Sequence, residues 1–547
     1  MDKLIEILFF FSRFLITGVG LYLIVLFFKL LKEEQNLGTT ISFHNEKQDL
    51  VMRSKREDIL IGRSSNSDLC IKDITVSRYF AKVQRVADDT YYLEKEGSGY
   101  LEVNGNERIK SSSLKNNDTI KIGDEGYTIG ISTSTITDNT VVMKILSGIT
   151  VFQLLIVSQI LLLGAASISV IIKAYLPIII IPWLYAFTVD KLKLKMTISI
   201  ELVVFFLTTL GITVAGSDTM VKVSIIFCLG FVAFLGLSLV LIQVRKFPKD
   251  KLNKMKIVLL VVLILLFFIN LIFADVTNGA KNWINIGGFS LQLSELCKLA
   301  LVFISGSFLI SGKKDLALLG IATIISLFAL VAINDLGTAA VFFVISFVGL
   351  YLKNGDLLLS AGITSVSLLL GKVLLKISST FQQRFITWQN PFDSYFDGGF
   401  HICKSLSGFV GGGLFGAGLY CGSIRDIYAS TTDIVFSLLA EEFGVVFFVI
   451  TMLLYVVLLL LAYTNSCRKS YYFLSCGILV LSSIAMQLLL NAGGSLNLIP
   501  LTGITAPWLS TGGSSLLVSY AMLALISDDI KLPKGLLKRK GKQYENK

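Results

Sequence analysis

The sequence predicts an all-α polytopic membrane protein into which a small all-β domain is inserted near the N-terminus. Hydrophobic residues make up 54% of the 547 residues and charged residues only 16%, a composition far from that of soluble domains. Apolar runs such as residues 257–274 approach the roughly 20 residues that a helix needs to cross a hydrocarbon core of about 30 Å. Because these runs are unbroken instead of alternating, we expect them to form helices and not a barrel.

The first segment, residues 1–36, is predicted to hold a retained transmembrane helix over residues 11–31. Its apolar stretch is too long for a secretion signal, carries Arg13 at its start and lacks a small-residue cleavage site. The next segment, residues 40–137, is polar and has short β-like runs separated by Asn, Asp, Ser and Gly. We therefore expect a soluble β-domain there, followed by two additional transmembrane helices within residues 145–192.

The remaining apolar runs fall within residues 197–530. They lie at residues 197–215, 220–243, 256–274, 295–312, 316–333, 337–352, 357–377, 445–464, 471–492 and 512–528. With the three earlier helices, the chain is predicted to cross the membrane about thirteen times, about ten of them in this region. Residues 531–547 form a basic tail.

Lys and Arg are concentrated in alternate loops between these runs, and such loops stay on the cytoplasmic side of a membrane. The parity of the runs then predicts that the β-domain and the basic tail are cytoplasmic. The loops at 275–294, 378–444 and 493–511 are predicted to lie on the extracytoplasmic face. The net charge of +11 follows from this topology, so nucleic-acid binding is not needed to explain it.

A carboxylate, Asp433, stands just ahead of the apolar run at 445–464. A helix running unbroken from Asp433 to Thr464 would be about 48 Å long at 1.5 Å per residue, well beyond the hydrocarbon thickness. We therefore expect a break at Gly444 and a short outer helix over 433–442 with Asp433 in its first turn. The alternative role for Asp433 is a helix N-cap, which is common. Glu441 and Glu442 are interpreted as the polar end of the short helix.

Other ionisable residues are predicted at the same level of the membrane. Asp335 interrupts two apolar runs, and Glu295 and Lys298 begin another run one helical turn apart. Ionisable groups that border a bilayer usually face a functional cavity, so these three residues are candidates for a substrate cavity. The alternative for Glu295 and Lys298 is an internal ion pair that orients the helix.

The long outer loop adds three cations, Arg384, Lys404 and Arg425, on the side where cations are usually few. Its many glycines allow close backbone approach, so the loop suits a polyanionic head group; the alternative is a flexible, turn-rich loop. The free amides at 509–515 suit phosphate in the same way, or form a capped helix start. No CxxC spacing occurs, and Cys403 and Cys421 are interpreted as unrelated thiols, with a disulfide as the alternative.

These stretches resemble the ordered signature motifs of the SEDS family, the FtsW/RodA/SpoVE-type proteins of bacterial cell division, elongation and sporulation. The motifs are "NWINIGGFSLQLSELCK", "NDLGTA", "RFITWQNPFD", "GFHICKSLSGFVGGGLFGAGL", "TTDIVFSLLAEEFG" and "LIPLTGITAPWLSTGGSS". The resemblance covers residues 197–530, a SEDS-like bundle, and implies a peptidoglycan glycosyltransferase that polymerises lipid II at the outer face of the cytoplasmic membrane. It places the family's essential aspartate on Asp433 and its other carboxylate motifs on Glu295 and Asp335.

The chain departs from the family pattern at several motif positions. They are Asn282, Leu293, Ile333, Asn334, Lys404 and Ile434. The three carboxylates remain, so these differences are expected to affect substrate affinity and partner choice more than the chemistry.

The resemblance also implies a mechanism and partners. An α-linked donor and a β-linked polymer require one inverting displacement, for which Asp433 is the candidate base. Arg384, Lys404 or Arg425, together with Mg²⁺ or Mn²⁺ held by ligands that we do not assign, would neutralise the departing undecaprenyl pyrophosphate. A class B penicillin-binding protein is the expected transpeptidase partner.

The cytoplasmic β-domain resembles a forkhead-associated (FHA) domain, a β-sandwich that binds phosphothreonine. The motifs are "IGRSSNSDLCIKDITVSRYFAKV", "YLEVNG" and "LKNNDTIKIGD". Arg63 and Ser77 fall on phosphate-contacting positions, and Arg78 is a candidate helper. Phe80 replaces the usual histidine and the "NGT" triplet is absent. The resemblance implies a phosphothreonine protein or a Ser/Thr kinase as partner; the alternative is a scaffold that has lost this activity.

Two other function classes compete with the glycosyltransferase. One is a flippase that transports lipid-linked precursors, and the other is a non-catalytic scaffold of cell division. A flippase should need polar groups continuous across the membrane, whereas the charged residues placed here cluster at the outer face. The sequence therefore favours the enzyme.

Overall fold

The computed structural model describes most of the chain. The described residues are 2–45, 48–64, 67–87, 90–107, 109–134, 139–192, 194, 196–245, 247, 249–277, 280–286, 289–310, 316–355, 358 and 379–528. All but one residue of the apolar run predicted at 357–377 lies outside them, as does the predicted tail, 531–547. The chain forms two compact units, a helical one (residues 1–30, 139–462 and 475–547) and a β-rich one (residues 31–138 and 463–474).

The helical unit is built from long apolar helices. They are α1 (Asp2–Asn36), α2 (Asn139–Leu162), α3 (Ile168–Lys191), α4 (Ser199–Val214), α5 (Met220–Val244), α6 (Lys249–Phe273), α7 (Leu293–Ile310), α8 (Leu316–Ala332), α9 (Leu336–Asn354), α14 (Val445–Ser466), α15 (Tyr471–Ser495) and α16 (Gly513–Ile526). Eight of the described helices are long and apolar enough to cross a membrane, namely α1, α2, α3, α5, α6, α9, α14 and α15. The outward faces are apolar too: Val232 of α5 is 65% exposed and Phe268 of α6 is 59% exposed, as lipid contact requires.

Helix α4 lies at the centre of the packing, because every one of its residues is buried. The additional helices α2 and α3 cover one side of it. Gln153 of α2 donates to the Thr209 hydroxyl over 2.9 Å, and the Tyr175 hydroxyl of α3 pairs with the Thr213 hydroxyl at 3.0 Å. These polar contacts between apolar helices fix the N-terminal helices on the rest of the unit.

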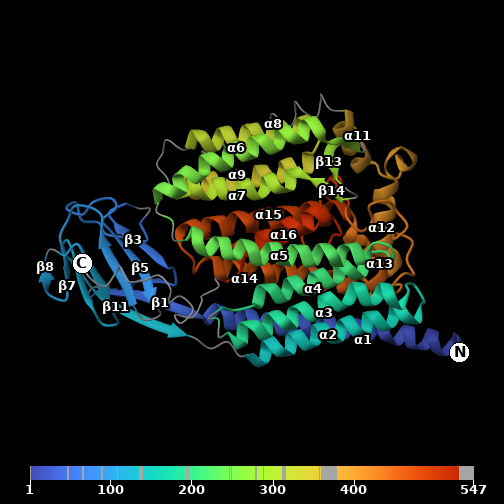
Figure 1. The fold of residues 1–547 in the computed structure, drawn as a ribbon, viewed down its shortest axis with the longest axis horizontal. Coiled ribbons are helices and arrows are strands. Elements are labelled where there is room, and N and C mark those ends of the chain that lie inside the picture. The colour runs from blue at the N-terminus through green and yellow to red at the C-terminus, as the bar shows by residue number, and fades with distance from the viewer. Residues whose placement is uncertain are drawn as a thin grey trace. The chain divides into compact units, whose positions relative to one another are not determined.

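Short elements gather at one end of the helical unit, at the right of Figure 1. They are the sheet β12 (Asp275–Thr277), β13 (Ala280–Ile286) and β14 (Phe289–Gln292), the helices α11 (Ser379–Gln389), α12 (Phe400–Gly412) and α13 (Val435–Phe443), and the 3₁₀ turn η2 (Tyr395–Asp397). The Lys281 amide of β13 bonds the Ile333 carbonyl at the end of α8, and Trp388 of α11 bonds the Asn497 carbonyl after α15. The three loops predicted to lie outside therefore meet at the same end.

The β-rich unit is a sandwich of two sheets. Its strands are β1 (Gly38–Asn45), β2 (Gln48–Ser54), β3 (Asp58–Gly62), β4 (Leu69–Cys70), β5 (Ala81–Ala87), β6 (Thr90–Lys95), β7 (Leu101–Val103), β8 (Asn106–Glu107), β9 (Ser111–Leu114), β10 (Thr119–Ile122) and β11 (Glu125–Ser134). One sheet has the order β2-β1-β11-β10-β7-β8 and the other β4-β3-β5-β6-β9.

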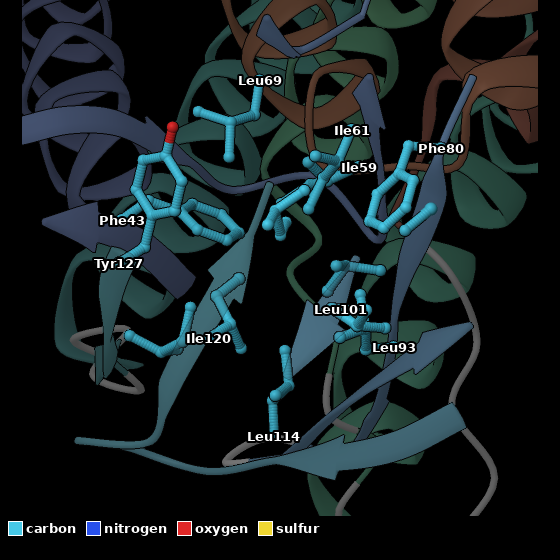
Figure 2. Close-up of a cluster of buried hydrophobic side chains, with 14 of the residues drawn as sticks. Phe43, Ile59, Ile61, Leu69, Phe80, Leu93, Leu101, Leu114, Ile120 and Tyr127 are labelled. Atoms are coloured by element: carbon cyan, nitrogen blue, oxygen red, sulfur yellow. The ribbon is translucent and has the colours of Figure 1, made fainter. Parts of the chain in front are cut away.

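Alternating side chains from both sheets fill the core of this sandwich (Figure 2). Ile59 and Ile61 of β3 and Leu93 of β6 are fully buried and face Phe43 and Ile120 of the other sheet. The prediction of an all-β domain within an otherwise helical chain is confirmed.

The β-rich unit also contains the loop between α14 and α15, residues 463–474. Arg468 of this loop pairs with the Glu34 carboxylate at the end of α1 over 2.8 Å. Glu34 precedes the first strand of the sandwich, so the ion pair holds the start of the β-domain against the α14–α15 loop.

Candidate functional site

Asp433 lies between two polar loops at the end of the helical unit. The break predicted at Gly444 is present, but α13 begins at Val435 and the residue at its N-cap position is Ile434. The interpretation of Asp433 as an N-cap is therefore wrong: its side chain precedes the helix and is partly exposed. Its amide donates to the Ala429 carbonyl over 2.9 Å, so the backbone turns sharply before the helix starts.

Residues 501–512 form the second loop at this position. Asn491 of α15 donates its amide group to the carbonyls of Thr432, Asp433 and Ile504, at 3.0, 3.2 and 2.6 Å. The Ser510 hydroxyl also bonds the Thr432 carbonyl, over 2.8 Å. An ideal Cβ placed on Gly503 would be 3.3 Å from Asp433 Oδ2. One buried amide on α15 thus holds the two loops together around the Asp433 carboxylate.

The electrostatic surroundings of Asp433 combine burial with nearby cations. Burial raises the pKa of the Asp433 carboxyl above its ordinary value, while a hydrogen bond from Thr432 and the positive charges of His401 and Arg384 oppose that rise. A carboxylate with a raised pKa is a better proton acceptor, and the adjacent cations suit an anionic leaving group. This arrangement can support transfer of a group from an anionic carrier to a hydroxyl.

Arg384 lies close to this carboxylate in the fold, and Lys404 lies on α12. Arg384 of α11 donates to the Thr502 carbonyl over 3.2 Å, on the loop that approaches Asp433. Lys404 is half-buried on α12, with its ammonium group 6.0 Å from the centre of the Phe400 ring. One turn earlier, His401 bonds the Tyr428 carbonyl over 3.2 Å. His401 was missed by the sequence analysis, and its position three residues before Lys404 was the available signal.

Arg425 has a different environment, because its guanidinium is occupied within the fold. It forms a two-pronged ion pair with Glu442 at 2.7 and 2.8 Å and donates to the Val214 and Ala215 carbonyls at 2.9 and 3.0 Å. It also stacks 3.9 Å from the centre of the Tyr420 ring. Burial nevertheless raises the pKa of Glu442 to about 7. The structure does not bring Arg425 to Asp433 as a free cation.

Glu441 and Glu442 lie at the C-terminal end of α13, as interpreted from the sequence, but they are not exposed to solvent. Both side chains are buried, at 7% and 2% exposure. Glu441 accepts from the amides of Ser423 and Ile424, each over 2.9 Å. A carboxylate that replaces missing backbone partners can be buried at the end of a helix, which the sequence pattern does not reveal.

The glycine-rich segment 412–418 closes the break between α13 and α14. The Val445 and Val446 amides donate to the Gly413 and Leu414 carbonyls, at 2.9 and 3.2 Å. On the other side, the Ala417 and Gly418 amides donate to the Glu441 and Glu442 carbonyls, at 2.8 and 3.0 Å. The loop therefore satisfies backbone groups that both helix ends leave open. Its glycines serve this close packing.

Asp335 and the Glu295–Lys298 pair form a second polar cluster at the same end. Asp335 caps α9 by accepting from the Thr338 amide at 3.1 Å, and it also accepts from Gln292 and Ser294 at 3.0 and 3.3 Å. Glu295 and Lys298 form a buried ion pair at 2.6 Å, as the internal ion-pair alternative predicts. All three carboxylate or ammonium groups therefore have partners within the fold.

The second cluster touches the Asp433 site through one loop. A Cβ on Gly337, in the first turn of α9, would meet Ile504 and Thr502, which flank the glycine nearest Asp433. The structure thus places the cluster next to the candidate site, and the 502–504 segment lies between them.

Strained backbone conformations also collect at this end. Among the described residues of the helical unit, five that are not glycine have positive φ angles, namely Asn334, Tyr420, Ala429, Asn497 and Trp508. The buried Trp508 has φ of +60°, which a bulky side chain rarely adopts. Such strain persists where the surrounding contacts fix a geometry, and it is concentrated at functional sites.

The sequence raised two further questions, whether metal ligands cluster in the fold and whether Cys403 pairs with Cys421. Within the described part of the chain, no group of three or more His, Cys, Asp or Glu side chains is arranged to hold a metal ion. Cys403 is buried and Cys421 is exposed, and both are free thiols in this structure.

The candidate phosphopeptide residues lie on adjacent loops of the β-sandwich. The Arg63 amide bonds the Ser77 carbonyl over 3.0 Å, which brings the two loops together, and the side chains of Arg63 and Arg78 are exposed. The Ser77 hydroxyl donates to the Ser98 carbonyl over 2.6 Å, so it must rotate to donate to a phosphate. Phe80 is fully buried in the core, where the lysine side chain of Lys95 lies 5.6 Å from its ring centre.

Comparisons with known proteins match both units. The family model of the FtsW/RodA/SpoVE cell cycle proteins matches residues 191–530, and the FHA domain model matches residues 59–123. The chain is 34% identical over 279 residues to peptidoglycan glycosyltransferase RodA of Mycobacterium leprae, which covers 46% of this chain and 58% of that relative. It is 32% identical over 254 residues to stage V sporulation protein E of Bacillus subtilis, covering 44% and 69% of the two chains.

A solved structure of a peptidoglycan synthase complex contains a chain with a similar fold. The TM-score is 0.51 at 24% identity, and the similarity covers 60% of this chain and 96% of that one. The matched region spans little more than half the length of the mycobacterial relative.

Two neighbouring glycines test whether the packing of α12 on α13 is required. A Cβ on Gly412 would overlap the Ala440 carbonyl, whereas a Cβ on Gly411 would meet no described atom within 4 Å. We expect Gly412→Ala to lower the thermal unfolding midpoint of the purified protein, because backbone cannot move aside as a flexible side chain can. Gly411→Ala is the matched control and should leave the midpoint unchanged or raise it. Equal midpoints for the two variants would contradict the packing described here.

Proposed function

Because the chain belongs to the FtsW/RodA/SpoVE family of cell cycle proteins, we propose that it is a peptidoglycan glycosyltransferase. It would polymerise lipid II into glycan strands during bacterial cell division, elongation or sporulation. The observation that carries the proposal is the position of Asp433, a partly buried carboxylate with a raised pKa beside the charges of His401 and Arg384. Relatives that bear the name peptidoglycan glycosyltransferase support the same activity.

The proposed orientation places this site on the extracytoplasmic face of the cytoplasmic membrane. It rests on the alternation of Lys and Arg between loops, which keeps the FHA domain and the basic tail in the cytoplasm. The meeting of the loops around 275–292, 379–444 and 496–512 at one end of the bundle supports it, because the same parity assigns all three to one side.

In the proposed step, the 4-hydroxyl oxygen of an acceptor sugar attacks the anomeric carbon of a lipid-linked donor. The new carbon–oxygen bond forms as the bond from that carbon to the pyrophosphate oxygen breaks, and the anomeric configuration inverts. The hydroxyl proton passes to Asp433, and undecaprenyl pyrophosphate leaves with the bonding electron pair. Arg384 and Lys404 are proposed to stabilise the charge that develops on the pyrophosphate.

The proposal includes a divalent cation, Mg²⁺ or Mn²⁺, that binds the pyrophosphate. Mg²⁺ commonly binds through one or two carboxylates together with substrate phosphates, so a protein site of three ligands is not required. When bound, the cation would supply further charge neutralisation at the leaving group.

Two protein partners are proposed. A class B penicillin-binding protein would cross-link the strands, and the similarity of fold to a chain from a peptidoglycan synthase complex is in keeping with such an assembly. A phosphothreonine protein of a Ser/Thr kinase pathway would bind the FHA domain through Arg63, Ser77 and Arg78. The loop 463–474, which belongs to the FHA unit, joins the two helices α14 and α15.

The proposed activity predicts polymerisation by the purified full chain in detergent with labelled lipid II and Mn²⁺ or Mg²⁺, to be measured with and without a transpeptidase partner. We expect glycan ladders from the native protein and none from Asp433→Asn, because the amide cannot accept the hydroxyl proton. Asp426→Asn, an exposed position in the same loop, is the matched control and should keep its ladders. Ladders of equal length from Asp433→Asn would remove Asp433 from the mechanism. The absence of ladders under every condition would favour the flippase or the scaffold.

A second prediction concerns phosphopeptide binding by the full chain. A degenerate pool of phosphothreonine peptides should bind the native protein, and Arg63→Ala should weaken binding by about tenfold or more, since a charge-assisted bond to phosphate is lost. Ser77→Ala should have a smaller effect, because its hydroxyl is engaged by the Ser98 carbonyl. Arg53→Ala, an exposed arginine on β2, is the control. Fluorescence anisotropy measures all four proteins, and equal binding of the unphosphorylated pool would contradict the assignment.

A further inference from the structure

Helix α1 contacts the loop that closes the break after Asp433. Arg13 donates from Nη1 to the Gly416 carbonyl over 2.8 Å. On either side of this bond, the Phe14 ring lies 4.9 Å from the Phe415 ring, and a Cβ on Gly418 would meet the Phe9 ring. Three positions of the 412–418 loop, residues 415, 416 and 418, therefore lie against α1.

The same helix continues its contact along α14. A Cβ on Gly20 would meet Phe447 in the first turn of α14, so the two helices approach closely. Phe447 also stacks on Phe152 of α2 at 5.7 Å. The start of α14, which follows Gly444, is thus held between the N-terminal helices and the 412–418 loop.

Gly416 occupies the middle of the loop, between the carbonyls and the amides that serve the two helix ends. Gly413 and Leu414 supply carbonyls to the start of α14, whereas Ala417 and Gly418 supply amides to the end of α13. A bond to the Gly416 carbonyl fixes the peptide that joins these two sets. The angle between α13 and α14, and with it the place of the Asp433 segment, therefore depends on how this peptide is held.

Arg13, which donates this hydrogen bond, lies outside the region that matches the family model. The FtsW/RodA/SpoVE match begins at residue 191, whereas α1 ends at Asn36. A second brace comes from α3, where Tyr175 pairs with Thr213 of α4. The carbonyls of Val214, at the end of α4, and of Ala215, directly after it, accept from Arg425. The N-terminal helices thus contact the 412–418 loop directly through α1, and they pack on the helix whose end binds Arg425.

We propose that Arg13 is a positioning residue for the Asp433 site, acting through the Gly416 carbonyl and the helix break at Gly444. The proposal deepens the glycosyltransferase function and rests on it for its kinetic consequence. The structural consequence, a loop held by α1, can be measured without any activity.

The test compares the native full chain with Arg13→Gln, Arg13→Lys and the control Lys32→Gln. Lys32 is exposed near the other end of α1, so its substitution removes the same charge without touching the loop. Hydrogen–deuterium exchange of peptides covering 412–420 reports the loop directly. Polymerisation kinetics with labelled lipid II separate kcat from KM for each variant.

We expect faster exchange in 412–420 and a kcat lowered by about tenfold in Arg13→Gln, with KM changed less than about threefold, because misplacement of a catalytic group lowers the chemical rate. Arg13→Lys keeps a donor and should return both quantities toward native values. Lys32→Gln should match the native protein in both measurements.

Several results would overturn the proposal. Native exchange in the loop of Arg13→Gln would show that Arg13 does not hold it, whatever the activity. Faster exchange with an unchanged kcat would show that the loop is held without effect on the site. Should Arg13→Gln fail to fold, Arg13→Lys still tests the proposal, since a fall in its kcat without faster exchange in the loop contradicts the coupling. Inactivity of the native chain would refute the glycosyltransferase function while leaving the exchange result valid for the loop.

Discussion

The arrangement of the candidate site depends on the break between α13 and α14. A continuous helix from the Asp433 segment to the end of α14 would be longer than a bilayer is thick, so the chain must turn at Gly444. That turn leaves amides and carbonyls without helical partners in a place with little water. The 412–418 loop supplies partners for both ends, and α1 contacts that loop. The Glu441 and Glu442 carboxylates and the end of α4 bind the segment that follows it, residues 420–425. The position of Asp433 is a consequence of this chain of contacts.

The charged residues of this end fall into two groups with different physical roles. Arg425, Glu442, Glu441 and Asp335 have their polar atoms occupied by the fold, and burial without such partners would be costly. Asp433 is partly exposed, and Arg384 and His401 lie near it. Groups that the fold leaves accessible are those that can act on a substrate, which is why the proposed mechanism uses Asp433, Arg384 and Lys404.

Much of this architecture was predictable from the sequence because it follows from local patterns. Unbroken apolar runs predict the helices, and turn residues between short β-like runs predict the sandwich. The break at Gly444 is predicted because a continuous helix would be longer than the bilayer is thick. The role of Arg425 was not predictable, because its partners Glu442 and Val214 are distant in sequence. Arg13 likewise contacts a loop about 400 residues away, so no local signal indicates its role. His401 could have been found from its spacing to Lys404, but its approach to Asp433 depends on tertiary packing.

The pH dependence of polymerisation tests most directly whether Asp433 is the base among these cations. The rate of the native chain should fall as the pH drops through a pKa above the ordinary aspartate value of 3.8, because protonated Asp433 cannot accept a proton. Removing the nearby positive charge in Arg384→Gln should move that acid limb to higher pH, since the cation lowers the pKa of Asp433. An acid limb that keeps its position in Arg384→Gln, measured at saturating lipid II, would contradict the account.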